Sequence, residues 1–392
     1  MGRCTKPAEA VAAVGEAWVQ APRIYYVHHG RSGVPVDWRR QIGRAADLGF
    51  DHVCAGPIFA AGRDPFLIAD LQASDPKLGM AGSSEDAVGE LAALCAAERL
   101  PLFLDIVLDR LAVDGASARA ANGLYEWRDH GDVVDPRHDP GFAHAATVRP
   151  DAGERLAVWW AEHLARLVRA GAAGFRLVGL DLLSNDALRG IVAATRGRTA
   201  CALWAWTPGL SWSRHAGLAG LGLDGVFAST PWWDGRAAWY VEEHESLRRI
   251  APVIGPAEAP LRIPPVDIDL RRRMLRLAAT TAGGLMMPAG FEDEIEADVR
   301  QATREVGHGA QGRRGPESSA QHNFTWMQST PSDHQSSEMR CLANNGLDWR
   351  TGLVKAMKPG SGPPGENCIV WQTAQCCSEE HQGLIRDSSR RI

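Results

Sequence analysis

The sequence predicts an α/β fold of the (β/α)8 TIM barrel type, on two observations. Short apolar runs alternate with amphipathic helical stretches from residue 22 to residue 305, and the alternation repeats eight times. The apolar runs carry few charged residues, which is typical of parallel strands that are covered on both faces. An open, doubly wound sheet gives the same local pattern, so the alternation alone leaves that fold open.

Eight apolar runs are the expected strands of this barrel. They are mostly apolar, and four of the eight end at glycine or a polar residue. In chain order they cover residues 23–30, 51–59, 100–109, 173–180, 200–206, 224–230, 251–259 and 284–290.

Helices are expected between these strands, where apolar residues recur every three or four positions. Their starts are indicated by capping residues, whose side-chain oxygens accept hydrogen bonds from the first backbone N–H groups, and by proline, which fits the first turn. The expected helix starts are Ser83 with Asp86, Ser184 or Asn185, and Thr207 followed by Pro208.

The composition excludes several classes of function. The chain has 392 residues, a formal net charge of −5 and a pI of about 6.2, which argues against a nucleic-acid partner, because such binding needs clustered basic charge. No apolar run approaches the roughly 20 residues that cross a membrane. Residues 1–21 form an N-terminal extension that is too polar for a signal peptide, so we expect a cytoplasmic protein.

No cofactor and no metal are expected. The sequence contains no phosphate loop of the GxxxxGK[ST] type, and the glycine turn 171–175 before the fourth strand is not a dinucleotide-binding GxGxxG motif. Its eight cysteines form no CxxC pair, which favours free thiols in a reducing cytoplasm. A zinc site among the cysteines near the C-terminus stays open, but their spacing does not support one.

The character of the sequence changes after residue 305. Residues 306–392 are rich in glycine, serine, glutamine and proline and show no periodicity. We interpret them as a tail of low order, because such a segment cannot bury enough apolar surface to offset its ordering entropy. Translation from an altered reading frame is the other interpretation, and the sequence does not separate the two.

Candidate site residues are those at the carboxyl ends of the expected strands, because barrel enzymes place their active sites there. Each has a plainer interpretation that also stays open: a buried ion pair for an Asp–Arg pair on adjacent strands, core packing for histidine, and packing beneath loops for tryptophan. The candidates are His28, His29, Asp105, Arg176, Asp181, Trp204, Trp206, Trp232, Trp233 and Glu258.

Three stretches resemble the α-amylase family of glycoside hydrolases (family 13-like). They are "DPKLG" (residues 75–79), "LFLDIVLDR" (102–110) and "LARLVRAGAAGFRLV" (164–178), within a resemblance that covers residues 22–300. The tryptophan-rich stretch 229–245 looks closest to the glucan maltosyltransferases that use maltose 1-phosphate. The resemblance implies an α-amylase-type barrel and an α-glucan or maltooligosaccharide as its partner.

The family's catalytic motifs match only in part. In the Asp-x-x-x-Asn-His motif of the third strand, Asp105 matches, but Asp109 and Arg110 replace the last two residues. In the Gly-x-Arg-x-Asp motif of the fourth strand, Arg176 matches, but Val178 stands where the nucleophile belongs.

The fifth and seventh strands depart from the family as well. The fifth strand should carry a glutamate acid, yet residues 201–209 contain no carboxylate. The histidine–aspartate pair expected after the seventh strand is absent, and only Glu258 is present. A retaining glycosidase needs two carboxyl groups about 5–5.5 Å apart, so these departures concern the reaction itself.

Three functional hypotheses follow. The first is a degenerate family member of α-glucan metabolism that binds glucan or a partner enzyme. The second is an active hydrolase or maltosyltransferase that uses Asp105 and Arg176 with Asp181 or Glu258 as displaced carboxylates. The third is a structural barrel or a truncated, inactive product. A homodimer is open under each of them.

Limited proteolysis is expected to remove residues 307–392 and to leave a folded fragment that ends near residue 305, because the tail adds little to the core. The check is the melting temperature of the fragment beside that of the intact chain. Collapse of the melting transition after cleavage would show that the tail belongs to the fold.

Overall fold

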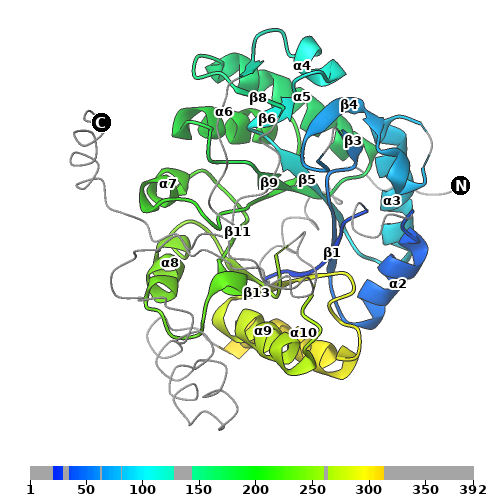
Figure 1. Cartoon of the computed structure of the whole chain (residues 1–392), viewed down its shortest axis with the longest axis vertical. Coiled ribbons are helices and arrows are strands. Elements are labelled where there is room, and N and C mark those ends of the chain that lie inside the picture. Colours follow the sequence, from blue (N-terminus) through cyan, green and yellow to red (C-terminus); the bar gives the residue numbers. More distant parts are fainter. Residues whose placement is uncertain are drawn as a thin grey trace, which may run out of the picture. The chain divides into compact units, whose positions relative to one another are not determined.

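The expected barrel is confirmed by the computed structural model, which describes residues 21–29, 35–61, 64–80, 82–127, 144–259 and 264–312. Its strands are β1 (Arg23–Val27), β2 (His52–Ala55), β5 (Leu102–Val107), β9 (Gly174–Val178), β10 (Ala202–Ala205), β11 (Gly225–Phe227), β12 (Val253–Pro256) and β13 (Gly284–Pro288). They close into a parallel barrel in the order β1-β13-β12-β11-β10-β9-β5-β2 (Figure 1). Because β1 pairs with both β2 and β13, the open sheet is excluded.

Helices follow the barrel strands and lie around the outside of the barrel (Figure 1). Their apolar faces pack on the strands, as alternating strand–helix sequences require. They are α2 (Trp38–Asp47), α3 (Ser84–Ala97), α5 (Gly153–Ala170), α6 (Asn185–Arg196), α7 (Trp212–Leu218), α8 (Trp239–Leu247), α9 (Ile268–Thr281) and α10 (Glu296–Gly312).

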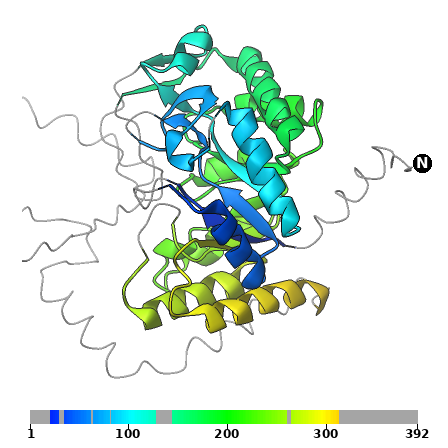
Figure 2. The same cartoon turned by 90° about the vertical axis from the view of Figure 1, so that its right-hand side faces the viewer.

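Two small antiparallel sheets were not predicted. β3 (Phe59–Ala61) pairs with β4 (Ile68–Ser74) and is followed by a 3₁₀ turn, Pro76–Leu78. The second sheet has the order β6-β8-β7 and lies beside the barrel in Figures 1 and 2. Its elements are β6 (Arg110–Ala112), α4 (Ala116–Ala120), β7 (Tyr125–Trp127) and β8 (Ala145–Val148). Four of these five strands have only three or four residues, and the longer β4 shows no regular alternation of buried and exposed residues, so none has a recognisable strand pattern.

Two of the three expected helix starts are confirmed. Ser83 and Asp86 form a reciprocal capping box at α3, and the Ser184 hydroxyl accepts from the backbone N–H of Ala187 at the start of α6. The expectation for Thr207 is wrong. Helix α7 begins later, after Ser211, and the Thr207 hydroxyl donates instead to the backbone carbonyl of Phe227.

Aromatic side chains fill the interior of the barrel between neighbouring strands. Trp204 of β10 stacks on Phe103 of β5, with ring centroids 3.7 Å apart and planes 7° apart. Gly174 lies between them on β9, where a Cβ atom would come within 2.3 Å of the Phe103 ring. A side chain at this position would displace the ring, so the glycine two residues before Arg176 has a packing role.

The last described helix passes the expected boundary of the barrel. Helix α10 continues to Gly312, and residues 313–392 lie outside the described residues, as do residues 1–20. Of the eight cysteines, Cys54, Cys95 and Cys201 fall within the described ranges, and all three are buried and free of disulfides. None of the helices in the described ranges is long and apolar enough to cross a membrane.

Candidate functional site

The Asp105 and Arg176 side chains form a bidentate ion pair inside the barrel. Arg176 Nε donates to Asp105 Oδ1 at 2.6 Å, and Arg176 Nη2 donates to Oδ2 at 2.5 Å. Both side chains have 0% exposure, and the two residues are register partners on β5 and β9. Two parallel charge-assisted hydrogen bonds are the strongest arrangement available to such a pair.

The surroundings of this pair satisfy both charges. The Tyr26 hydroxyl donates to Asp105 Oδ2 at 2.8 Å, and the Arg176 guanidinium lies 4.7 Å from the ring centroids of Tyr26 and Trp206. Burial and the Asp105 carboxylate raise the pKa of Tyr26 well above its usual value, so its hydroxyl stays a donor. Each charge is therefore paired, and neither group is open to solvent.

Val178, at the position that the family's motif gives to the nucleophile, is a fully buried residue at the end of β9. It faces Val107 in the register of β5, and its carbonyl accepts from the backbone N–H of Leu108 at 3.0 Å. An enclosed valine has no group that can bond to a sugar carbon.

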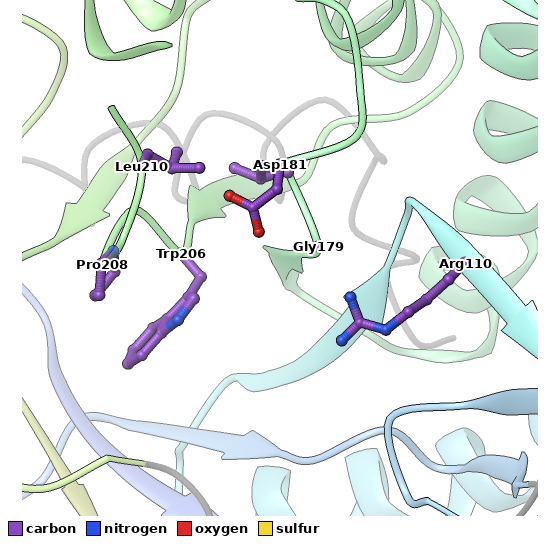
Figure 3. A pocket seen from close by; sticks show the side chains of 7 residues that line it. Arg110, Gly179, Asp181, Trp206, Pro208 and Leu210 are labelled. Carbon is purple, nitrogen blue, oxygen red and sulfur yellow. The ribbon is translucent and has the colours of Figure 1, made fainter. Parts of the chain in front are cut away.

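A pocket opens just beyond this buried level, at the carboxyl ends of β5, β9 and β10 (Figure 3). It is a partly open hollow, and its empty space of about 240 Å³ includes open solvent at its mouth. Its walls come from three segments that follow these strands, and the lining residues are Arg110, Gly179, Leu180, Asp181, Trp206, Pro208 and Leu210. The site therefore lies on the face where barrel proteins bind their ligands.

Asp109 supports the pocket from behind. Its Oδ1 accepts from Arg110 Nη1 at 3.0 Å, while Oδ2 has no hydrogen-bond partner among the described residues. Gly179 has a φ of +67°, and a Cβ atom there would lie 2.2 Å from Asp109 Oδ1. Only glycine combines this backbone conformation with so close an approach, so the turn brings the pocket wall directly against Asp109.

Burial raises the pKa of the Asp109 carboxyl above its usual value, and the nearby Asp181 charge adds to this shift against the opposing effect of Arg110. Asp181 itself is only partly buried. Its carboxylate points into the space between Trp206 and Arg110 (Figure 3). The pocket thus has a buried carboxyl behind its wall and a more open carboxylate inside it.

Arg214 anchors the segment that carries Asp181. Its Nη2 donates to the Leu180 carbonyl at 2.7 Å, and its Nη1 donates to Asn185 Oδ1. Burial lowers the pKa of Arg214, and the Asp181 charge offsets part of this shift. These contacts tie helix α7 to the turn after β9.

The two histidines of the first strand end are both buried and do not line the pocket. Their rings stack on each other with centroids 5.3 Å apart, and His28 also stacks on Phe66. His29 Nε2 lies 3.2 Å from Asp75 Oδ2. Asp75 belongs to the "DPKLG" stretch, and it also caps the short turn by accepting from Lys77 N at 2.9 Å.

The four tryptophans separate into different environments. Trp204 has 1% exposure and packs inside the barrel. Trp233 stacks on Tyr240 and donates from Nε1 to the Ala237 carbonyl at 2.9 Å. Trp206 lines the pocket, and Trp232 meets its edge at 6.4 Å between centroids. Of the four, Trp206 is therefore the one in the pocket.

Glu258 is fully buried after β12, and its Oε1 accepts from the backbone N–H of Ala259 at 2.8 Å. It does not line the pocket, so Glu258 and Asp181 are not brought together there. Across the described residues, no group of three or more His, Cys, Asp or Glu side chains is arranged to hold a metal ion.

The pocket contains residues to which sequence analysis assigned no role. Arg110 in the lining, and Asp109 behind it, were visible as replacements in the third-strand motif, which is a usable signal. The sequence contains no signal that places Gly179, Pro208 and Leu210 in the pocket, because their positions depend on the backbone path of two loops.

The closed parallel barrel, with a polar pocket at the carboxyl ends of its strands, is a TIM-barrel fold. Comparisons with known proteins show which of them share this fold. No family profile matches the chain. A maltogenic α-amylase from Thermotoga neapolitana superimposes with a TM-score of 0.56 at 13% identity, covering 74% of this chain and 76% of that one. The cyclic α-maltosyl-(1→6)-maltose hydrolase of Arthrobacter globiformis gives 0.55 at 15% identity, covering 76% and 85%.

The sequence relative is more specific. The chain is 32% identical over 301 residues to the α-1,4-glucan:maltose-1-phosphate maltosyltransferase of Burkholderia pseudomallei (strain K96243). The match covers 71% of this chain, which spans about a quarter (26%) of the length of that relative. The barrel therefore has the α-amylase-family fold.

Replacing Asp105 with Ala should lower the free energy of unfolding by roughly 3–5 kcal/mol, because Arg176 would be left as an unpaired buried charge. Adding Arg176→Met should recover part of the loss. Denaturant unfolding of the single and double variants measures the coupling, and strictly additive losses would show that the pair does not interact. Asp186→Ala, at a carboxylate with 89% exposure, is the control.

Replacing Asp109 with Asn should change how stability depends on pH. Because the folded pKa of Asp109 is raised, the folded state keeps a proton that the unfolded chain releases above about pH 4. The wild-type chain therefore loses stability as pH rises from there through the folded pKa. In Asp109→Asn the side-chain amide oxygen can still accept from Arg110, so the variant should lack this loss. Equal pH profiles of melting temperature for variant and wild type would contradict the prediction.

Proposed function

We propose that this chain is an α-glucan-binding member of the α-amylase family that lacks ordinary retaining glycosidase activity. One observation carries the proposal: the nucleophile position holds the enclosed Val178, and β10 with its following loop contributes Trp206 and no carboxylate to the pocket. Without both members of the carboxyl pair, neither a glycosyl-enzyme intermediate nor protonation of the leaving oxygen is available.

The binding part of the proposal rests on the pocket. Asp181 offers a carboxylate acceptor, Arg110 offers guanidinium donors, and Trp206 offers an aromatic wall, all within one concave site. Sugars present hydroxyl groups and weakly polar ring faces, which such a combination can recognise. The sequence relative, by its name, acts on α-1,4-glucan and maltose 1-phosphate.

A rewired enzyme is the second candidate. Asp181 favours it, because this carboxylate lies in the pocket three residues beyond Val178. Glu258 supports it less, since its side chain is buried outside the pocket and bonds to the backbone of the next residue. Asp109 would be the nearer source of a proton, because its raised pKa favours the acid form.

Purified protein incubated with maltooligosaccharides and with maltose 1-phosphate should release no products above background, while calorimetric titration should detect maltooligosaccharide binding. Trp206→Ala should weaken that binding by roughly three- to tenfold, because it removes one wall of the pocket and an Nε1–H without a partner among the described residues, and a hydrogen bond contributes about 0.5–1.5 kcal/mol. Trp127→Ala, at an exposed tryptophan with 62% exposure outside the pocket, is the matched control.

The outcomes separate the candidates. Turnover that disappears in Asp181→Asn would overturn the non-catalytic proposal and establish the rewired enzyme. Absence of both turnover and binding would favour the purely structural barrel. Melting curves of each variant guard against loss of binding through unfolding, since Trp206 also packs against Arg176.

A further inference from the structure

We propose that Asn122, in the turn between α4 and β7, is a site of spontaneous covalent modification, where the asparagine converts to aspartate and isoaspartate. The reaction needs no enzyme, because the nucleophile is the backbone nitrogen of the next residue, Gly123. Asparagine is among the residues that are chemically labile in proteins. Neither residue lines the pocket, so the site is independent of the proposed function.

Asn122 and Gly123 are the two central residues of a tight turn. Their φ angles are +41° and +77°, and the Leu124 N–H donates to the Ala121 carbonyl at 3.1 Å. Positive φ at both central positions is the type I′ pattern, for which Asn–Gly is a preferred sequence. Ala121 and Leu124 are buried, whereas Asn122 and Gly123 are exposed. The turn is thus held at both ends while its two central residues face water.

Both groups that react are unengaged and accessible. The Asn122 side-chain amide and the Gly123 N–H make no hydrogen bond to any described residue. A Cβ atom at position 123 would meet nothing within 4 Å, so the space around the nitrogen is open. Because glycine has a wide range of φ and ψ, its nitrogen can rotate toward the side chain of the residue before it.

The other asparagine in the described ranges lacks these features. Asn185 is the first residue of α6, and its Oδ1 accepts from Arg214 Nη1. A Cβ atom at Gly217 would lie 2.0 Å from Asn185 Nδ2, so the amide is closely packed. The next residue, Asp186, carries a side chain beside its nitrogen. Asn185 is therefore the matched comparison within the same chain.

Water is the only co-reactant of the conversion. The Gly123 nitrogen loses its proton and bonds to Asn122 Cγ, while the Cγ–Nδ2 bond breaks and Nδ2 leaves as ammonia with that proton. A five-membered succinimide ring remains. Addition of water at Cγ opens the ring to aspartate, and addition at the backbone carbonyl opens it to isoaspartate, whose main chain runs through Cβ and Cγ. No atom is oxidised or reduced.

The isoaspartate product changes the connection to β7. It adds one carbon atom to the main chain between Ala121 and Leu124, whose side chains are buried. Strand β7 follows at once, and its Tyr125 hydroxyl donates to the Leu108 carbonyl at 2.7 Å and accepts from Trp160 Nε1 at 2.9 Å. We expect the longer connection to break the Leu124–Ala121 hydrogen bond and to raise local opening at the start of β7.

The test is to age the full chain in mildly alkaline buffer at physiological temperature, and then to map its peptides by mass spectrometry that resolves isoaspartate. Cleavage after arginine gives peptides 120–128 and 177–189, each with a single asparagine, and separates them from the second Asn–Gly pair at 345–346. Peptide 120–128 should lose its asparagine form with time, and faster as pH rises, because the Gly123 nitrogen must lose its proton. Peptide 177–189 should keep its asparagine. An unaged sample digested in parallel gives the background, and conversion of 120–128 no faster than that of 177–189 would overturn the proposal.

Two variants separate the cause from the consequence. Gly123→Ala should lose most of the conversion, because its methyl group shields the nitrogen, although the positive φ strains alanine. Asn122→Asp keeps a residue that tolerates positive φ, and it adds the charge without the extra main-chain atom. Hydrogen exchange at residues 124–127 should be faster in aged wild type than in fresh wild type and fresh Asn122→Asp. Equal exchange in all three, after conversion to isoaspartate, would overturn the effect on β7.

Discussion

The buried Asp105–Arg176 pair is the constraint on which the interior of this barrel depends. Two full charges in an apolar interior are tolerated only when each satisfies the other, because an isolated buried charge costs several kcal/mol. The register that sets Asp105 opposite Arg176 aligns β5 with β9. Tyr26 then adds a third strand to the network. The two charges satisfy each other at this level, and the polar groups that line the pocket come from the loops above it.

The loops above the pair use glycine to bring charged groups close to each other. Gly179 turns the chain immediately after β9 at a positive φ, and it sets the turn against Asp109. Asp181 follows two residues later and enters the pocket. The two carboxyls lie in different environments. Burial raises the pKa of the Asp109 carboxyl, whereas Asp181 is only partly buried.

The periodicity of the sequence predicted the eight strands and the helices around them. The repetition of eight strand–helix units also favoured a closed barrel. The periodicity missed the small sheets β3-β4 and β6-β8-β7, because most of their strands have only three or four residues and burial along β4 does not alternate. Thr207 was misjudged because β10 ends in a buried turn, where the hydroxyl satisfies a carbonyl of the next strand. The pocket could be placed at a strand end from sequence, but its members depend on loop paths.

Burial also explains which motif residues match the α-amylase family and which do not. Losing Asp105 would leave Arg176 charged and alone in the interior, so this pair is costly to change one residue at a time. Placing valine at 178 has the opposite consequence, because an apolar side chain in an enclosed position removes a desolvation cost. Directly after β10, the buried Trp206 side chain likewise avoids the desolvation cost of a carboxylate, and its ring packs on the guanidinium of Arg176. Stability therefore favours keeping Asp105 and Arg176 together, and it does not require a carboxylate at position 178.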